Sequence, residues 1–269
     1  MTESFSIVPG DPDSSVVIHV PHSSRMIPAE IRAGILLDDE ALERELDAMT
    51  DAHTDVIAER AAGQAGRRPW LFINRLSRFV VDPERFPDER EEMNAVGMGT
   101  VYTRTTTGDV LRSPSADEIS GLVDHYSGPY ADAFEQLVDE RLDAVGKVTI
   151  IDLHSYPLTA SPYELHGDGP RPEVCLGSDA FHTDTIVLST ARETFERHTP
   201  MGDVGVDSPF AGCYVPLKHY GETPDVHGLM IELRRDLYLD ESFNLREDAA
   251  QPLIAGLVEV IATTDVSPV

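Results

Sequence analysis

The chain has 269 residues, 41% of them hydrophobic, and 48 acidic against 21 basic side chains give it a formal net charge of −27. This length and apolar content suffice for one substantial core, so we predict a single domain over residues 1–269. The negative charge repels polyphosphate and anionic lipid, which argues against nucleic acid or a membrane as a partner.

No apolar run is long enough to span a bilayer, and the first ten residues lack a basic and an apolar segment, so we expect a cytoplasmic protein. Cys175 and Cys213 form no C-x-x-C motif and are interpreted as small buried residues. Only Lys147 and Lys218 are lysines. The acidity suggests adaptation to high salt or an ordinary acidic cytosolic enzyme, and stability measured against KCl concentration would separate the two.

The first half of the chain contains strand-like runs, a helical segment and a turn-rich segment. A β-branched apolar run predicts a buried strand at residues 15–20. Apolar residues at helical spacing predict one helix over residues 38–62. Two further strands are predicted at 70–73 and 79–81, and residues 108–127 are rich in turn-forming residues.

The second half alternates helices and strands. In chain order we predict a helix at 130–145, a buried strand at 148–153, a Pro- and Gly-rich loop at 161–172, a helix at 183–198, a strand at 229–233 and a helix at 246–263. This alternation predicts an α/β fold with a mixed, mainly parallel sheet flanked by helices on both faces.

Polar residues lie where several of these predicted strands end. They are His22, Arg78, His154, Glu232 and Arg234. Ligands bind at the carboxyl ends of the strands in open parallel sheets, so these side chains are candidates for one site. Two histidines, a carboxylate and arginines are the groups that metal-assisted hydrolysis of an acidic substrate requires.

His22 and His154 are the candidate zinc ligands. A lone histidine is more often a buried, hydrogen-bonded core residue, but two histidines at equivalent strand ends favour a metal site. Asp152 lies two residues before His154 and could orient a ligand imidazole by accepting a hydrogen bond from the ring nitrogen that does not bind the metal.

Several segments resemble the zinc carboxypeptidases, and more closely the N-formylglutamate amidohydrolase family. The segments around His22, His154 and Glu232 look like the carboxypeptidase metal and general-base motifs, in the same order. The hallmarks of the closer family are Pro-His-Ser at 21–23, Thr-Asp-Ala-His-Thr-Asp at 50–55, Ser-Arg-Phe-Val-Val-Asp at 77–82, Asp-Leu-His-Ser at 152–155, Ser-Pro-Phe-Ala-Gly at 208–212 and His-Gly-Leu-Met-Ile-Glu-Leu-Arg at 227–234. The resemblance implies a carboxypeptidase-like fold and one catalytic Zn²⁺.

The third zinc ligand departs from the carboxypeptidase pattern, because Arg25 stands where those enzymes carry a glutamate. Asp51 is our choice of carboxylate ligand. Together with Asp47 and Asp55 it would share one face of the predicted helix, and such a run is often only a solvated acidic face. Asp55, or His53 in its place, remains an alternative ligand.

A second departure is Glu84, which precedes Arg85 where the family usually has an asparagine. The resemblance implies that Arg85 holds the substrate carboxylate, since its guanidinium suits a bidentate contact. Glu84 would either weaken the binding of a dicarboxylate or anchor Arg85.

The resemblance implies hydrolysis of the amide bond of an N-acyl amino acid, similar to N-formylglutamate, by zinc-activated water. Glu232 would transfer the proton and Arg78 would stabilise the oxyanion, while Tyr156 and Arg234 would join Arg85 in binding this small-molecule substrate. A structural pairing of Glu232 with Arg234 or Arg235 is the alternative for that residue. Alternative functions are an aminoacylase or carboxypeptidase and a noncatalytic binding protein on the same fold.

Overall fold

A seven-stranded sheet forms the centre of the computed structural model, which describes residues 4–165, 167 and 169–265. The strands are β1 (Phe5–Val8), β2 (Val16–Val20), β3 (Trp70–Asn74), β4 (Val148–Tyr156), β5 (Val174–Gly177), β6 (Val204–Val206) and β7 (Val226–Arg234). Their order across the sheet is β1-β3-β2-β4-β7-β5-β6. Strands β3, β2, β4 and β7 are parallel neighbours, while β1 pairs antiparallel with β3 and β5 pairs antiparallel with β7.

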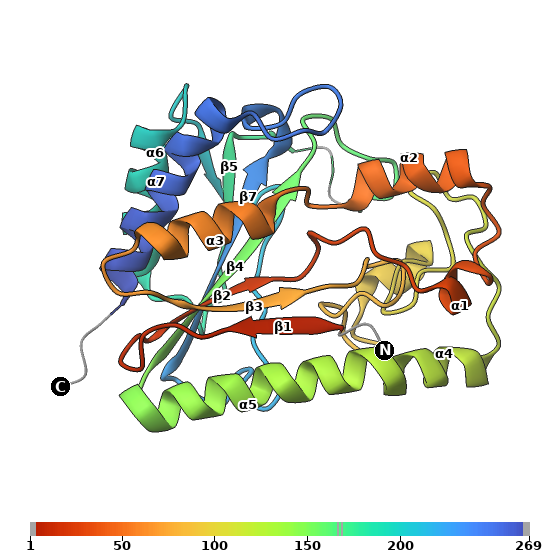
Figure 1. Ribbon diagram of the computed structural model, residues 1–269, viewed down its shortest axis with the longest axis horizontal. Helices are drawn as coiled ribbons and strands as arrows, with labels where there is room; N and C mark the ends of the chain where they lie inside the picture. Colours follow the sequence, from red (N-terminus) through yellow and green to blue (C-terminus); the bar gives the residue numbers. More distant parts are fainter. Residues whose placement is uncertain (1–3, 166, 168, 266–269) are drawn as a thin grey trace.

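Helices cover both faces of this sheet (Figure 1). The helices of the described chain are α1 (Ala29–Arg32), α2 (Asp39–Met49), α3 (Thr54–Gln64), α4 (Ala116–Leu122), α5 (Gly128–Val145), α6 (Thr185–His198) and α7 (Glu247–Thr264), with short 3₁₀ turns at Glu92–Val96 and Arg235–Leu237. Helices α3, α6 and α7 pack on one face, and α5 packs on the other. The predicted α/β fold, with a mainly parallel sheet between helices, is confirmed.

The alternation of side chains along β2 explains how one short strand supplies both cores. Val16, Ile18 and Val20 face the helices α3 and α7, whereas Val17 faces α5. All five residues of β2 are buried, as expected for a central parallel strand covered on both faces. Strand β4 is buried over all nine residues and continues through Tyr156, so His154 lies within the strand instead of after it.

The single helix predicted over residues 38–62 is wrong. Helix α2 ends at Met49, Thr50 adopts an extended conformation, and His53 has a positive φ of 65° before α3 begins at Thr54. The backbone N–H of Asp51 donates to the carbonyl of His22, 3.0 Å away, and therefore leaves the helical ladder. The shared helical face of three aspartates does not exist, and the break turns Asp51 into the protein.

Three other local predictions need correction. Residues 79–81 form a buried turn, not a strand, in which Arg112 donates to the carbonyl of Phe79 over 2.7 Å. The segment 108–127 contains helix α4, which begins with a capping box between Ser115 and Glu118, and a π-helical turn at Val123–Ser127. Strands β1, β5 and β6 were not predicted, since runs of three or four residues carry a weak pattern.

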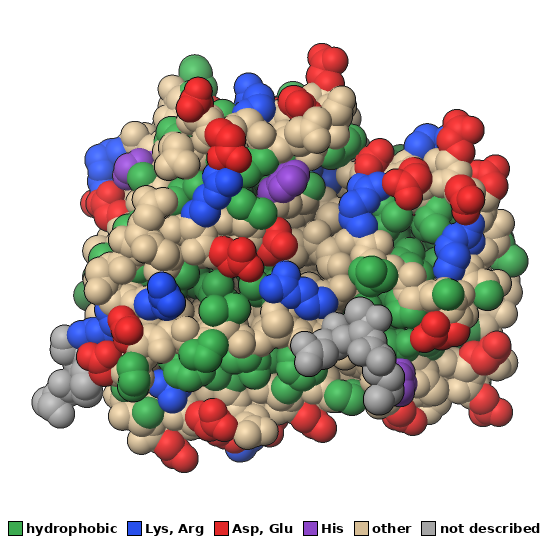
Figure 2. Space-filling model, in the orientation of Figure 1, with side chains coloured by type: hydrophobic (Ala, Val, Ile, Leu, Met, Phe, Trp, Pro, Cys, Tyr) green, Lys and Arg blue, Asp and Glu red, His purple; other side chains and the backbone are tan. Residues whose placement is uncertain are grey.

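The surface is rich in carboxylates. On the face shown in Figure 2, Asp and Glu side chains lie mainly around the periphery, many of them beside Lys or Arg. No helix within the described residues is long and apolar enough to cross a membrane.

Candidate metal centre

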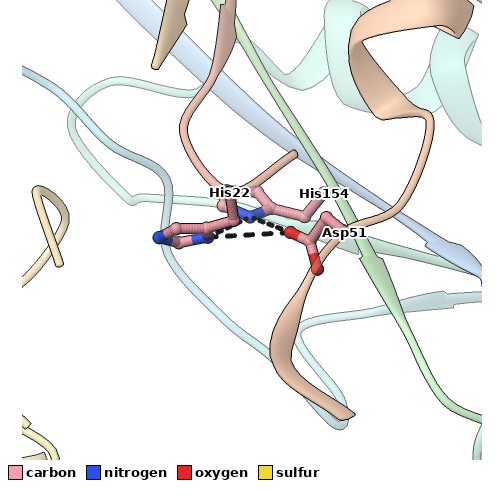
Figure 3. Close-up of side chains that lie close together, drawn as sticks. All are labelled: His22, Asp51 and His154. Carbon is pink, nitrogen blue, oxygen red and sulfur yellow. Dashed lines mark hydrogen bonds and ion pairs between the residues drawn. The ribbon is translucent and has the colours of Figure 1, made fainter. Parts of the chain in front are cut away.

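Three segments bring His22, Asp51 and His154 together at the carboxyl edge of the sheet. His22 follows β2, His154 lies near the end of the adjacent β4, and Asp51 comes from the break between α2 and α3. All three side chains are buried. Neighbouring parallel strands thus position the two histidines, and the break between α2 and α3 positions the aspartate beside them (Figure 3).

The facing atoms of these residues have the spacing of metal ligands. His22 Nδ1 lies 3.3 Å from His154 Nδ1, and Asp51 Oδ2 lies 3.2 Å from His154 Nδ1 and 3.6 Å from His22 Nδ1. A tetrahedron with bonds of about 2.0 Å has edges of about 3.3 Å. The three atoms therefore fit one face of a tetrahedral zinc site, with three protein ligands as in catalytic zinc centres.

Carboxylates stand behind both imidazole rings. His22 Nε2 lies 3.0 Å from Asp82 Oδ1 in a hydrogen bond, and His154 Nε2 lies 3.1 Å from Asp152 Oδ1. A hydrogen on Nε2 leaves Nδ1 with the lone pair that a metal needs. His154 Nε2 makes no well-aligned hydrogen bond within the described residues.

The two carboxylate oxygens of Asp51 face different partners, one the Arg235 guanidinium and the other the histidines. Its Oδ1 accepts a hydrogen bond of 2.9 Å from Arg235, whose other nitrogen donates over 2.6 Å to the carbonyl of Ala48 at the end of α2. Burial alone would raise the pKa of Asp51, but its hydrogen bonds to His154 and His22 and the Arg235 guanidinium hold that pKa well below its usual value. Asp51 therefore presents an ionised oxygen to the histidine pair.

A model of the N-formylglutamate amidohydrolase family matches residues 14–239. The chain belongs to this family. It is similar to the crystal structure of N-formylglutamate amidohydrolase from Ralstonia eutropha JMP134, with 21% identity, a TM-score of 0.79 and 96% of each chain covered. It is also similar to a gene product from Agrobacterium tumefaciens, with 18% identity and a TM-score of 0.70 over 97% of this chain and 94% of the other. No curated protein matches significantly.

The other proposed third ligands of this amidohydrolase-family chain have partners elsewhere. His53 Nε2 lies 3.1 Å from the carbonyl oxygen of Phe243, and Asp55 accepts a hydrogen bond from the N–H of Val56. Neither belongs to the group of converging ligand atoms that contains Asp51. The geometry therefore favours Asp51 over both alternatives.

Glu232 is buried on β7, directly opposite His154 in the strand register. Its Oε2 accepts no hydrogen bond within the described part of the chain. Burial raises the pKa of Glu232 to about 8, against the opposing influence of His154. Neither alternative pairing is formed within the described residues: the Arg234 guanidinium donates to Asp236 and to the carbonyl of Arg171, and Arg235 donates to Asp51 and Ser155.

Arg78 and Arg85 meet at Asp82. Arg78 donates to Asp82 Oδ2 through Nε and Nη2, at 3.2 and 2.7 Å, and Arg85 Nε lies 3.6 Å from the same oxygen. Burial would raise the pKa of Asp82, but the two guanidinium groups hold it well below its usual value. Within the described residues, Arg78 Nη1 and both terminal nitrogens of Arg85 make no hydrogen bond, which leaves donors for an anion.

Tyr156 lies on β4 but directs its hydroxyl away from bulk solvent. That hydroxyl donates to the carbonyl of Pro172, and Arg171 lies over the ring at 4.9 Å. The structure therefore gives Tyr156 and Arg234 internal partners in the chain, and their contact with a substrate stays a prediction.

Sequence reasoning missed His19 and did not place Asp82, Glu84 or Arg235 next to the proposed ligands. His19 carried a signal, since a histidine inside a buried apolar strand requires a partner, and Arg235 stood next to a motif arginine. Glu84 does not anchor Arg85. Its carboxylate turns to the histidines, with Oε2 lying 3.2 Å from His154 Nε2 and 3.8 Å from His22 Nδ1.

Proposed function

We propose that this member of the amidohydrolase family is a zinc-dependent enzyme that hydrolyses the amide bond of an N-acyl amino acid of the N-formylglutamate type. The observation that carries the proposal is the convergence of His22 Nδ1, His154 Nδ1 and Asp51 Oδ2 at mutual distances of 3.2 to 3.6 Å. These three residues would hold the ion. When bound, zinc would lower the pKa of a water molecule and polarise the acyl carbonyl.

Glu232 is the proposed proton carrier. The water oxygen forms a bond to the acyl carbon, the amide C–N bond breaks, and the proton that the water loses passes through the Glu232 carboxylate to the leaving nitrogen. The products are a carboxylic acid and an amine, so atoms and charge balance. The apolar burial that raises the pKa of Glu232 also makes it a stronger base than an exposed glutamate.

Arg78 and Arg85 are the proposed anion-binding groups. Arg78 Nη1 would donate to the oxyanion that develops on the acyl oxygen, while its other nitrogens are held by Asp82. The terminal nitrogens of Arg85 would bind the α-carboxylate of the substrate in a bidentate contact. Because Glu84 faces the histidines, it does not compete for Arg85, which supports the binding of an acidic substrate.

The test combines metal analysis with a substrate panel. We expect purified protein to carry zinc and to release formate from N-formylglutamate faster than from formylated neutral amino acids. The same panel should contain N-acetyl amino acids and small peptides, since preference for those substrates would identify an aminoacylase or a carboxypeptidase. A zinc-loaded protein that hydrolyses none of these compounds would favour the noncatalytic alternative.

A further inference from the structure

A second cluster of possible metal ligands lies next to the first. It consists of His19 on β2, Asp152 on β4 and Glu84 in the loop after β3, and one ligand atom of each lies within 4.8 Å of the others. His19 Nδ1 is 2.9 Å from Asp152 Oδ1 and 3.3 Å from Glu84 Oε1. These separations resemble those of the first cluster and suit ligands around one small cation.

Asp152 Oδ1 and Glu84 Oε1 both face His19 Nδ1, while the other oxygens have further neighbours: the N–H of Tyr214 donates to Asp152 Oδ2, and His154 Nε2 lies 3.2 Å from Glu84 Oε2. His19 Nε2 faces the hydroxyl of Tyr130 at 2.5 Å, so only Nδ1 is directed at the carboxylates. A hydrogen on Nδ1 would be used by Asp152, and Glu84 Oε1 accepts no hydrogen bond within the described part of the chain. The Glu84 side chain is only 10% exposed. A buried carboxylate oxygen without a donor is strongly unfavourable unless a positive charge lies beside it.

We propose that His19, Glu84 and Asp152 bind a second divalent cation, separate from the proposed catalytic ion. One imidazole nitrogen and two carboxylate oxygens suit Zn²⁺ or Mn²⁺, whereas Ca²⁺ takes six to eight oxygen ligands. The cation would give Glu84 Oε1, which accepts no hydrogen bond within the described residues, a positive partner.

His154 lies between the two clusters. Its Nδ1 faces His22 and Asp51, while its Nε2 lies 3.1 Å from Asp152 and 3.2 Å from Glu84. A cation on Asp152 and Glu84 would draw charge from the carboxylates that stand behind this imidazole. Carboxylates in that position raise the basicity of a metal-bound histidine, so the second cation would make His154 a weaker donor to the first.

The experiment is a count of zinc ions per chain. Metal-free protein is dialysed against excess Zn²⁺, desalted, and analysed for zinc and protein by mass spectrometry. We expect two ions in the wild type, one in Glu84→Gln and one in His22→Ala, because each variant removes a ligand of a different cluster. The matched control is Glu232→Gln, which neutralises another buried glutamate at the site but belongs to neither cluster and should retain two ions.

The outcomes separate this proposal from the proposed function. One ion in the wild type that is lost in His22→Ala and kept in Glu84→Gln would overturn the second site and leave the catalytic site standing. One ion lost in Glu84→Gln and kept in His22→Ala would support the second site and contradict the first.

Co²⁺ titration of the wild-type protein gives a measurement that does not depend on how the variants fold. Two absorption components with separate saturation would support two centres. A single component that saturates at one equivalent would overturn the second.

Discussion

Replacing Glu232 by glutamine changes one buried group and leaves the ligand cluster intact. Glutamine has nearly the same shape, and Glu232 Oε2 has no hydrogen-bond partner in the described part of the chain to lose. The substitution removes the ability to carry a proton. We therefore expect zinc content to be unchanged and KM to change little.

The expected loss in kcat is about 10² to 10⁴-fold, the usual contribution of general acid–base catalysis. This range corresponds to about 2.7 to 5.4 kcal/mol of activation free energy. The assay measures formate release from N-formylglutamate alongside zinc content. The control is Glu45→Gln, since Glu45 is a buried glutamate whose oxygens accept hydrogen bonds from Thr106, and its replacement should leave kcat unchanged.

In the metal-free protein, Glu232→Gln should also change how the free energy of unfolding depends on pH. Glu232 has a pKa raised from 4.5 to about 8 in the folded chain, so its contribution to stability is full below pH 4.5 and is lost as the pH rises towards 8. At pH 7 the carboxyl destabilises the fold by about 3 kcal/mol. Urea unfolding should therefore show Glu232→Gln gaining stability over the wild type from pH 5 to pH 8.

Two results would refute the reasoning about Glu232. Full kcat in the glutamine variant would exclude this residue as the proton carrier. A variant that loses zinc together with activity would show that Glu232 acts in metal binding, and the separation of chemistry from metal binding would then be wrong.

The remaining predictions concern metal and substrate binding. Replacing either histidine of the first cluster by alanine should remove most of the catalytic zinc without unfolding the protein, and full retention of both ions would show that the site is misassigned. Asp51→Ala should weaken zinc affinity by more than about 100-fold, which exceeds the effect typical of outer-shell groups. Asp47→Ala is the control and should leave zinc affinity unchanged, because the Asp47 side chain pairs with the exposed Arg25. Arg85→Ala should raise KM by about 10- to 100-fold for carboxylate-bearing substrates but not for an N-formyl amine, and Arg90→Ala, which removes an exposed ion pair, should change neither.

The central strands were predictable because a strand that is buried on both faces consists mainly of apolar residues. The runs that form β2 and β4 are almost entirely apolar or β-branched, and such runs fit a parallel sheet covered on both faces. The turn at residues 79–81 has the same apolar character, but its burial comes from Arg112 and the loop around it. Periodicity cannot separate a buried strand from a buried turn when the contact that decides the matter is distant in sequence.

The proximity of His22 and His154 was predictable for a related reason, since a strand end in a parallel sheet fixes where a side chain can lie. Asp51 lies next to the two histidines, as its predicted role as a zinc ligand requires, but the helix on which it was placed does not exist. Its position depends on a hydrogen bond to His22 and on Arg235, which is 184 residues away in the chain. No local pattern encodes a helix break that is stabilised from the other end of the sequence.

The charges around the candidate site explain why a cation belongs there. Five carboxylates and three guanidinium groups line the candidate site, which leaves two excess negative charges when the histidines are neutral. The carboxylates are those of Asp51, Asp82, Glu84, Asp152 and Glu232, and the guanidinium groups are those of Arg78, Arg85 and Arg235. Without metal, the chain compensates by holding protons: burial raises the pKa of Glu232, and Glu84 and Asp152 raise that of His154 although burial opposes them. One divalent cation would balance the excess and displace those protons, so metal and protons compete for the same site. An acidic substrate would add further negative charge, and a second cation beside Glu84 would help to offset that charge as well.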